Sequence, residues 1–296
     1  SWKGKAYKVS IYWDWADTSS YVDNPNDASD PWTFSSLFDA TRPITAPMAL
    51  SLDSFDNVWV YFGTGRYIGQ DDKTNNDTQY LFGIKDPFFC SYYDASNGNY
   101  YRNYSSTLAL AVSDLFNADP YIITTDGSVF DDGSGLSRIT DFDELLAVAR
   151  NTEDQDAYPD YFDGWYRTLE TDQERVITKF SVLGGIVFAP AFVPSDDVCG
   201  YGGDSNLYGL YYETGTAYYK SVFGEDVETI TISGEVYEMV TGKISLGAGK
   251  SSSLGIHVGQ EEGAKAFIQQ STGTVLEMSL DPALNIKSGL INWREK

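Results

Sequence analysis

The stretch "NVWVYFGTGRYIGQ", residues 57–70, decides the fold class of this chain. Alternating aromatic and β-branched residues are followed by three glycines, Gly63, Gly65 and Gly69. A glycine-rich loop that holds a phosphate needs the spacing G-x-G-x-x-G or the ending G-K-[ST], and a helix after it. This stretch has neither motif, and no helical pattern follows it. It is typical instead of a β-strand that ends in a tight turn, where glycines adopt backbone angles that other residues avoid.

The composition favours strands and argues against several classes of function. Aromatic residues make up 15% of the 296 residues and there are only 3 methionines, which is typical of side chains that pack on pleated sheets. The chain has 20 basic and 43 acidic residues, a net charge of −23, which repels nucleic-acid backbones and anionic lipid surfaces. No apolar run is long enough to span a membrane, and the first residues already have a strand pattern. If the protein is exported, we expect its signal sequence outside this chain.

Short strand patterns recur about every ten residues and form three groups of about four strands. Between the first and second groups, about residues 87–163, the pattern changes. There "TDFDELLAVARN" has apolar residues at helical spacing with Thr140 as its N-cap, and "STLALAVSDLF" is a second candidate helix. Repeated groups of four strands predict an all-β chain of propeller blades, with residues 87–163 as a peripheral, partly helical insertion. A lone strand and about three blades are too few to close a ring.

Several motifs resemble, in the same order, the C-terminal region of the PilC/PilY family of type IV pilus tip proteins. The segment "ITAPMALSLDSFDNVWVYFGTGRYIGQDDKTNNDTQYLFGIKDP" is similar to the family's "VYFGTGKYLG" strand, polar loop and "YGI.D" strand. A second family segment resembles "GWYRTL…ERVITKFSVLGGIVFAPAFVPSDDVCGYGGDSNLYGLYYETG", and the family's terminal "SWRE" resembles "SGLINWREK". The resemblance covers nearly the whole chain and is weakest across the insertion.

This resemblance implies a modified β-propeller of which residues 1–296 are the C-terminal part, exposed outside the cell on a pilus tip. It implies roles in pilus assembly, twitching motility and adhesion, without enzyme activity. The expected partners are the rest of the propeller, supplied by an upstream polypeptide, and pilins or minor pilins, with a host or other surface as a candidate ligand. Neither nucleic acid nor a membrane span is expected. The alternative is a secreted propeller that binds or processes a glycan or a small ligand.

A partial propeller has a consequence for its surface. Blades cover one another's apolar faces, so we expect bare faces beside "KAYKVSIYW" and beside "GLINWREK". Leaving ~1,000 Å² of apolar surface exposed forgoes ~25 kcal/mol, more than the net stability of a typical domain. We therefore expect a second polypeptide against those faces, and aggregation or association of the chain on its own.

Two acidic loops are candidate calcium sites, because Ca²⁺ takes six to eight oxygen ligands from a flexible loop. One loop holds Asp126, Asp131 and Asp132. The other has the spacing D-x-D-x-x-x-D-x-x-D, and its carboxylates are Asp154, Asp156, Asp160 and Asp163. Neither loop places the glycine and the glutamate of an EF-hand, so the alternative is an acidic, solvated loop. No other cofactor is expected.

The two cysteines and the single histidine also restrict the chemistry. Cys90 and Cys199 lie in no metal-binding motif, and each follows a blade strand into a loop, which predicts a disulfide between them. A cysteine in an upstream region is the alternative partner. His257 lies in a strand pattern and predicts a structural role, and one histidine argues against most zinc and haem sites.

A tyrosine-rich stretch, "SYYDASNGNYYRNY", marks the edge of the insertion. Exposed tyrosines among Asn and Ser residues are good contact residues for a protein or a glycan. The alternative is that these rings pack the insertion onto the propeller. The tyrosines are Tyr92, Tyr93, Tyr100, Tyr101 and Tyr104.

Overall fold

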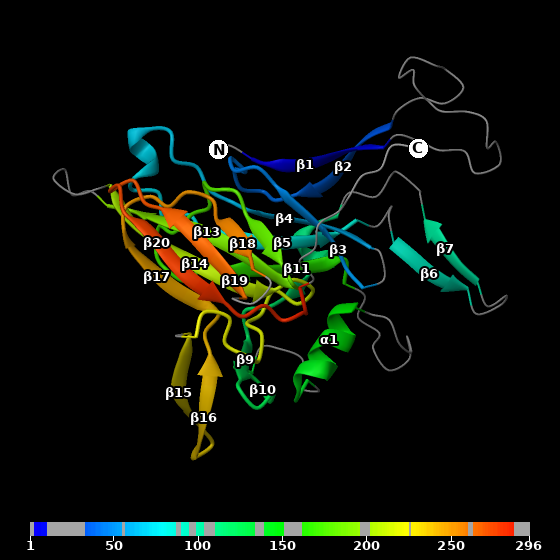
Figure 1. The fold of residues 1–296 in the computed structure, drawn as a ribbon. Helices are drawn as coiled ribbons and strands as arrows, with labels where there is room; N and C mark the ends of the chain where they lie inside the picture. Colours follow the sequence, from blue (N-terminus) through cyan, green and yellow to red (C-terminus); the bar gives the residue numbers. More distant parts are fainter. Residues whose placement is uncertain are drawn as a thin grey trace, which may run out of the picture.

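Most of the regular secondary structure in the described part of the chain is β-strand (Figure 1). Its structure is a computed structural model that describes residues 3–10, 33–54, 57–86, 90–94, 99–103, 110–133, 139–150, 162–195, 202–224, 226–259 and 263–286. These residues include one α-helix and two short 3-10 helices, η1 (Gln70–Asp72) and η2 (Val112–Asp114). Within them, no helix has the length and apolar character that a membrane crossing requires.

Three sheets form the body of the fold and share one large core. The first has the order β3-β4-β5-β11-β8, with strands Ala49–Leu52, Val58–Gly63, Tyr80–Lys85, Gly164–Thr168 and Phe116–Asn117. The second has the order β12-β13-β14-β17, with strands Ser181–Leu183, Ile186–Pro194, Gly203–Tyr211 and Lys243–Ala248. The third has the order β18-β19-β20, with strands Gly255–Val258, Ala264–Gln269 and Val275–Leu280. All neighbours are antiparallel except the short β8, which runs parallel to β11.

A two-stranded sheet at the N-terminal end covers β4 and β5 (top of Figure 1). Its strands are β1 (Lys5–Ser10) and β2 (Thr33–Asp39). It packs through a second, smaller core, whose buried residues are Ala6, Leu37, Phe38, Ala40, Val60, Phe62, Phe82, Ile84, Leu110 and Leu115. The opposite face of β1 leaves Tyr7 and Val9 more than half exposed. A bare blade face beside "KAYKVSIYW" stays a prediction, and the face expected beside "GLINWREK" lies outside the described residues.

The segment 87–163 is joined to the rest of the chain by several main-chain pairings. It contains the hairpin β6 (Cys90–Asp94) and β7 (Asn99–Asn103), the strand β8, the strands β9 (Tyr121–Thr124) and β10 (Val129–Asp131), and the helix α1 (Phe142–Arg150). β8 joins the first body sheet, and β9 pairs with β16 (Glu235–Val240) of a hairpin completed by β15 (Val227–Ile232). Figure 1 shows β9, β10, β15, β16 and α1 together below the body sheets.

The helix expected in "TDFDELLAVARN" is confirmed, with one correction at its start. The predicted apolar face consists of Phe142, Leu145, Leu146 and Ala149. Phe142, Leu145 and Ala149 are buried, and Leu146 is partly buried against the main core, as the helical spacing predicted. The cap is Asp141 rather than Thr140, because the Asp141 carboxylate accepts the N–H of Glu144 at 2.9 Å. Thr140 lies one residue earlier and donates both its N–H and its hydroxyl to the Glu144 carboxylate.

The second helix considered, in "STLALAVSDLF", is wrong for the part that the structure describes. Leu110 forms a β-bridge with Phe38, and its main chain exchanges hydrogen bonds with that neighbouring strand. The residues after it form only η2, a single turn. Leu110 and Leu115 are both buried in the smaller core. Packing against β2 therefore overrides the local preference for helix.

Trp165 fixes the first two body sheets against each other. Its indole N–H donates to the carbonyl of Tyr212 at 2.8 Å, across the boundary between the two sheets. A Cβ atom on Gly83 would lie 2.4 Å from the indole, and one on Gly215 would lie 2.3 Å from it, so only glycine fits at these positions. The motifs "GWYRTL", "YLFGIKD" and "LYGLYYETG" therefore meet around one ring. The expected all-β, propeller-like fold is confirmed. Two of the described sheets, β12-β13-β14-β17 and β10-β9-β16-β15, have four antiparallel strands, and the described sheets do not close into a barrel.

Candidate functional site

The glycine-rich turn after β4 is held by the segment that follows β11. The N–H of Val176 donates to the carbonyl of Thr64 at 2.9 Å. A Cβ atom on Gly63 would lie 2.3 Å from the Val176 side chain, and one on Gly65, whose φ is +148°, would lie 2.6 Å from that of Arg175. Gly63 and Gly65 of "GTGRYIG" are therefore required for the close approach of another chain segment. The expected strand is confirmed, but the expected tight turn is wrong: residues 64–79, which include η1, form a loop between β4 and β5 that packs against Arg175 and Val176.

Arg175 organises the loop between β4 and β5. Its side chain is buried, with the residue only 4% exposed. The guanidinium donates to the carbonyls of Arg66 at 3.0 Å, of Asp72, and of Asn75 at 3.1 Å, and to that of Gln173 at 2.9 Å. Burial lowers the pKa of this guanidinium, but an arginine remains charged in proteins. One buried cation thus binds three carbonyls of the same loop and fixes its path.

Asp72 closes the same loop from the other side. Its carboxylate accepts the main-chain N–H groups of Ile68 and Gly69, each at 2.8 Å. It also binds the Arg66 guanidinium at 2.7 and 2.8 Å. Burial alone would raise the pKa of Asp72, but the hydrogen bonds from Gly69, Arg66 and Ile68 outweigh it and lower the pKa to about 2. Asp72 is therefore ionised at neutral pH and acts as a fixed acceptor.

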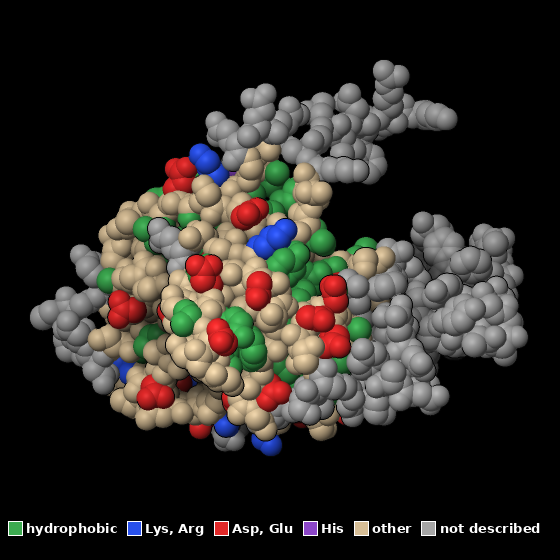
Figure 2. All heavy atoms as spheres, turned by 90° about the horizontal axis from the view of Figure 1, so that it is seen from below, with side chains coloured by type: hydrophobic (Ala, Val, Ile, Leu, Met, Phe, Trp, Pro, Cys, Tyr) green, Lys and Arg blue, Asp and Glu red, His purple; other side chains and the backbone are tan. Residues whose placement is uncertain are grey.

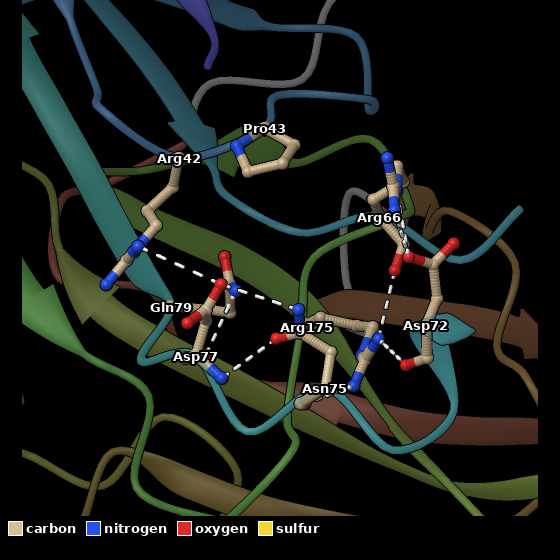
Figure 3. A pocket seen from close by; sticks show the side chains of 8 residues that line it. All are labelled: Arg42, Pro43, Arg66, Asp72, Asn75, Asp77, Gln79 and Arg175. Atoms are coloured by element: carbon tan, nitrogen blue, oxygen red, sulfur yellow. Dashed lines mark hydrogen bonds and ion pairs between the residues drawn. The ribbon is translucent and has the colours of Figure 1, made fainter. Parts of the chain in front are cut away.

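These side chains surround a polar cavity of about 110 Å³ (Figure 3). Its lining residues are Arg42, Pro43, Arg66, Asp72, Asn75, Asp77, Gln79 and Arg175. Arg42 lies on the opposite side from Arg66 in Figure 3 and donates to the carbonyl of Thr78 at 3.2 Å. The arginines stay protonated and Asp72 stays ionised near neutral pH, so the lining is poorly suited to proton transfer. The arrangement fits a structural or binding role.

Glu174, the neighbour of Arg175, binds the second body sheet. Its buried carboxylate accepts from the Asn206 amide at 2.6 Å and from the Tyr208 hydroxyl at 2.7 Å, both on β14. The ammonium of Lys243, on β17, lies 3.4 Å away. Burial, with the charge of Glu174 next, raises the pKa of the Tyr208 hydroxyl, which therefore remains a donor. The motif "ERV" thus connects two sheets: Arg175 binds the loop between β4 and β5 of the first body sheet, and Glu174 binds β14 of the second.

The candidate calcium ligands are only partly covered by the structure. Asp154, Asp156 and Asp160 lie outside the described residues. Asp163 is described and buried, and its main-chain carbonyl accepts the N–H of Lys85 at 2.8 Å. In the other acidic loop, Asp126 accepts the hydroxyl of Thr124 at 2.6 Å and the N–H of Ser128 at 3.0 Å, and so closes a turn. Among the described residues, no group of three or more His, Cys, Asp or Glu could hold a metal ion. Calcium in the loop of Asp154 stays a prediction.

The tyrosine-rich stretch forms the hairpin β6–β7. Tyr92 lies opposite Tyr101, and Tyr93 lies opposite Tyr100. Tyr104 lies outside the described residues, and the use of this hairpin as a contact surface stays a prediction.

The predicted disulfide is not tested. Cys90 begins β6 opposite Asn103, and Cys199 lies outside the described residues. His257 lies on β18 and is exposed, at the edge of the third sheet.

The sequence analysis did not identify Glu174 and Arg175 as the residues that connect the first two body sheets. The only signal was a charged pair in front of the apolar stretch "VITKF".

Acidic side chains dominate the charged surface seen from below, the face that carries α1 and the hairpin β15–β16 (Figure 2). Exposed acids on these elements include Asp143, Glu228, Glu235 and Glu238. Basic side chains are sparse on the same face. This distribution is unfavourable for binding to phosphate backbones.

Comparisons with known proteins support the fold. No family model matches the chain, and no curated protein sequence matches it. Among solved structures, the chain is similar to the crystal structure of the C-terminal domain of PilY1 from Pseudomonas aeruginosa, with a TM-score of 0.55 and 18% sequence identity. The match covers 94% of this chain and 55% of that chain, so this protein spans about half the length of the solved domain. In fold, the chain is therefore similar to part of the C-terminal domain of PilY1, in agreement with the resemblance of its sequence motifs.

Proposed function

We propose that this chain is a propeller module of an extracellular type IV pilus protein, with structural and adhesive roles in pilus assembly, surface attachment and twitching motility. The observation that carries the proposal is the similarity of fold to the PilY1 domain over 94% of the chain. The motifs of the PilC/PilY family, quoted above in their order, support it independently. We propose no enzyme activity, because the polar cavity uses its arginines and Asp72 to hold a loop.

The geometry favours a rigid module that is completed by further polypeptide. Trp165, Glu174 and Arg175 fix the first two body sheets to each other through buried hydrogen bonds. The outward face of β1 exposes Tyr7 and Val9, which is an apolar surface suited to packing by another blade. We propose that the rest of a propeller packs there, and that pilins or minor pilins bind the completed protein.

The proposal is tested by deleting the gene in the source bacterium. We expect fewer surface pili by electron microscopy and a smaller twitching zone, both restored by the wild-type gene. A gene carrying Val9→Asp should restore them poorly, because the substitution places a charge in the proposed packing face. The control is Val236→Asp on β16, where the valine is also largely exposed but lies on the projecting hairpin. Normal pili and normal twitching in the deletion strain would refute the proposal.

A further inference from the structure

A second cavity lies where β3, β12 and the residues just before β18 meet. β3, β12 and β18 are each an edge strand of their sheet, and β3 lies beside β12. The cavity has a volume of about 510 Å³, which is in the range of ligand sites in proteins. Its lining residues are Met48, Ala49, Leu50, Lys179, Phe180, Ser181, Val182, Ser253 and Leu254.

One side of this cavity is apolar and open to solvent. On β3, Leu50, which lines the cavity, is 67% exposed, and Leu52, which lies outside the cavity lining, is 55% exposed. The two leucines are two residues apart, so they lie on the same face of the strand. Phe180 and Leu254 provide a buried apolar floor. A pair of exposed leucines on an edge strand is unusual, because edge strands are normally protected by charge or cover.

The main chain of β3 offers a free edge beside those leucines. β3 pairs on one side with β4, in the register Leu50 opposite Val60 and Leu52 opposite Val58. Among the residues that the structure describes, no second strand forms a hydrogen-bonded ladder with β3, although β12 packs beside it. An exposed edge of this kind can accept an extended peptide as an additional strand.

Lys179 gives the cavity a charge preference. Its side chain is exposed, and within the described part of the chain no ion pair or hydrogen bond involves its ammonium. An uncompensated ammonium at the rim of an apolar cavity favours a ligand that carries a carboxylate next to apolar groups.

We propose that this cavity binds an extended, acidic and apolar peptide segment of another polypeptide, added as a strand to β3. The peptide main chain pairs with the free edge of β3, an apolar side chain enters the cavity beside Leu50 and Phe180, and a carboxylate pairs with Lys179. A small molecule would leave the edge of β3 unpaired, which favours a peptide. This inference does not rest on the pilus proposal, since it concerns binding by the purified protein.

The test uses a fluorescein-labelled decapeptide of alternating Leu and Asp residues, with anisotropy measured as the protein is titrated in. We expect saturable binding. Lys179→Glu should weaken it about fivefold or more, because an attraction becomes a repulsion, and Leu50→Asp should abolish it. Lys220→Glu and Ile68→Asp are the matched controls, since both residues are exposed outside the cavity, and neither should change the affinity. A Leu–Lys peptide should bind the Lys179→Glu protein better than it binds the wild type.

Two further probes separate strand pairing from simple apolar contact. A peptide N-methylated at alternate residues lacks the donors for a ladder, so it should bind much more weakly. Sodium octanoate should compete only weakly. Absence of saturable binding, or equal affinity of the N-methylated peptide, would overturn the proposal. If octanoate displaced the peptide fully and the N-methylated peptide bound as tightly as the unmodified one, the cavity would be assigned to small amphipathic acids instead.

Discussion

Replacement of Arg175 by methionine should destabilise the protein strongly. Methionine keeps much of the length and apolar volume of the side chain but removes every donor. Three carbonyls of the loop between β4 and β5 then lose their bonds to a charged group, each worth about 1.5–3 kcal/mol. The bonds share one donor group, and water reaches part of this loop, so their contributions do not add fully. We therefore expect Arg175→Met to lower the free energy of unfolding by about 3–4 kcal/mol.

The assay is urea unfolding followed by the fluorescence of the 7 tryptophans, with trypsin digestion as a local probe. Lys73 lies within the loop that Arg175 holds, so cleavage there should become faster in Arg175→Met. The matched control is Arg42→Met, on the opposite side of the same cavity. Arg42 is partly exposed and lies 3.8 Å from Asp77, so its loss should cost less than about 1 kcal/mol. A loss below about 1 kcal/mol for Arg175→Met, with unchanged cleavage at Lys73, would show that the loop holds its shape without Arg175.

Three further predictions follow from the packing and the charges. The pKa of Asp72 is about 2 in the folded protein, against an ordinary value of 3.8. The ionised carboxylate therefore contributes about 2 kcal/mol to the free energy of unfolding above pH 4, and this contribution is lost as the pH falls from 4 to 2. The difference in unfolding free energy between the wild type and Asp72→Asn should therefore shrink over that range; a constant difference would contradict the assignment. Gly83→Ala should lower the free energy of unfolding by about 1–3 kcal/mol, because the added Cβ would overpack against Trp165. Gly255→Ala should leave thermal unfolding nearly unchanged, because the nearest atom to its Cβ, the carbonyl oxygen of Phe267, lies 3.7 Å away. Val9→Asp should leave the thermal midpoint nearly unchanged while reducing self-association in sedimentation velocity; unchanged association would mean that the exposed face of β1 is not adhesive.

The strands of this protein could be predicted from sequence because local alternation specifies them. "IVFAPAFVP" corresponds to β13 over its whole length, and "NVWVYFGTG" contains β4. The hairpin β15–β16 was missed, although Val, Thr and Ile alternate in β15. Its turn has positive φ at Ser233 and Gly234, which is the two-residue geometry that favours hairpins. A Ser-Gly pair is a weaker turn signal than Asn-Gly, so the pattern did not stand out.

The joint between the sheets could not be predicted in the same way. Arg175 binds carbonyls that are about a hundred residues earlier in the chain, and Glu174 binds residues more than thirty positions later. No local periodicity encodes such distant partners. Only the motif resemblance indicated that "GTGRYIG" and "ERV" belong to one fold. The contact between the two motifs could be seen only in the structure.

The most direct test of the pilus assignment is the location of the protein on intact cells. An epitope tag inserted between Ser233 and Gly234, at the exposed turn of the projecting hairpin, should not disturb the body sheets. Immunogold electron microscopy, with immunoblots of sheared surface pili, then reports where the protein resides. We expect gold on the pili, and tagged protein in the sheared fraction that disappears in a strain unable to assemble pili. Label confined to the medium or the cell interior, or a sheared fraction unchanged without pili, would contradict the assignment.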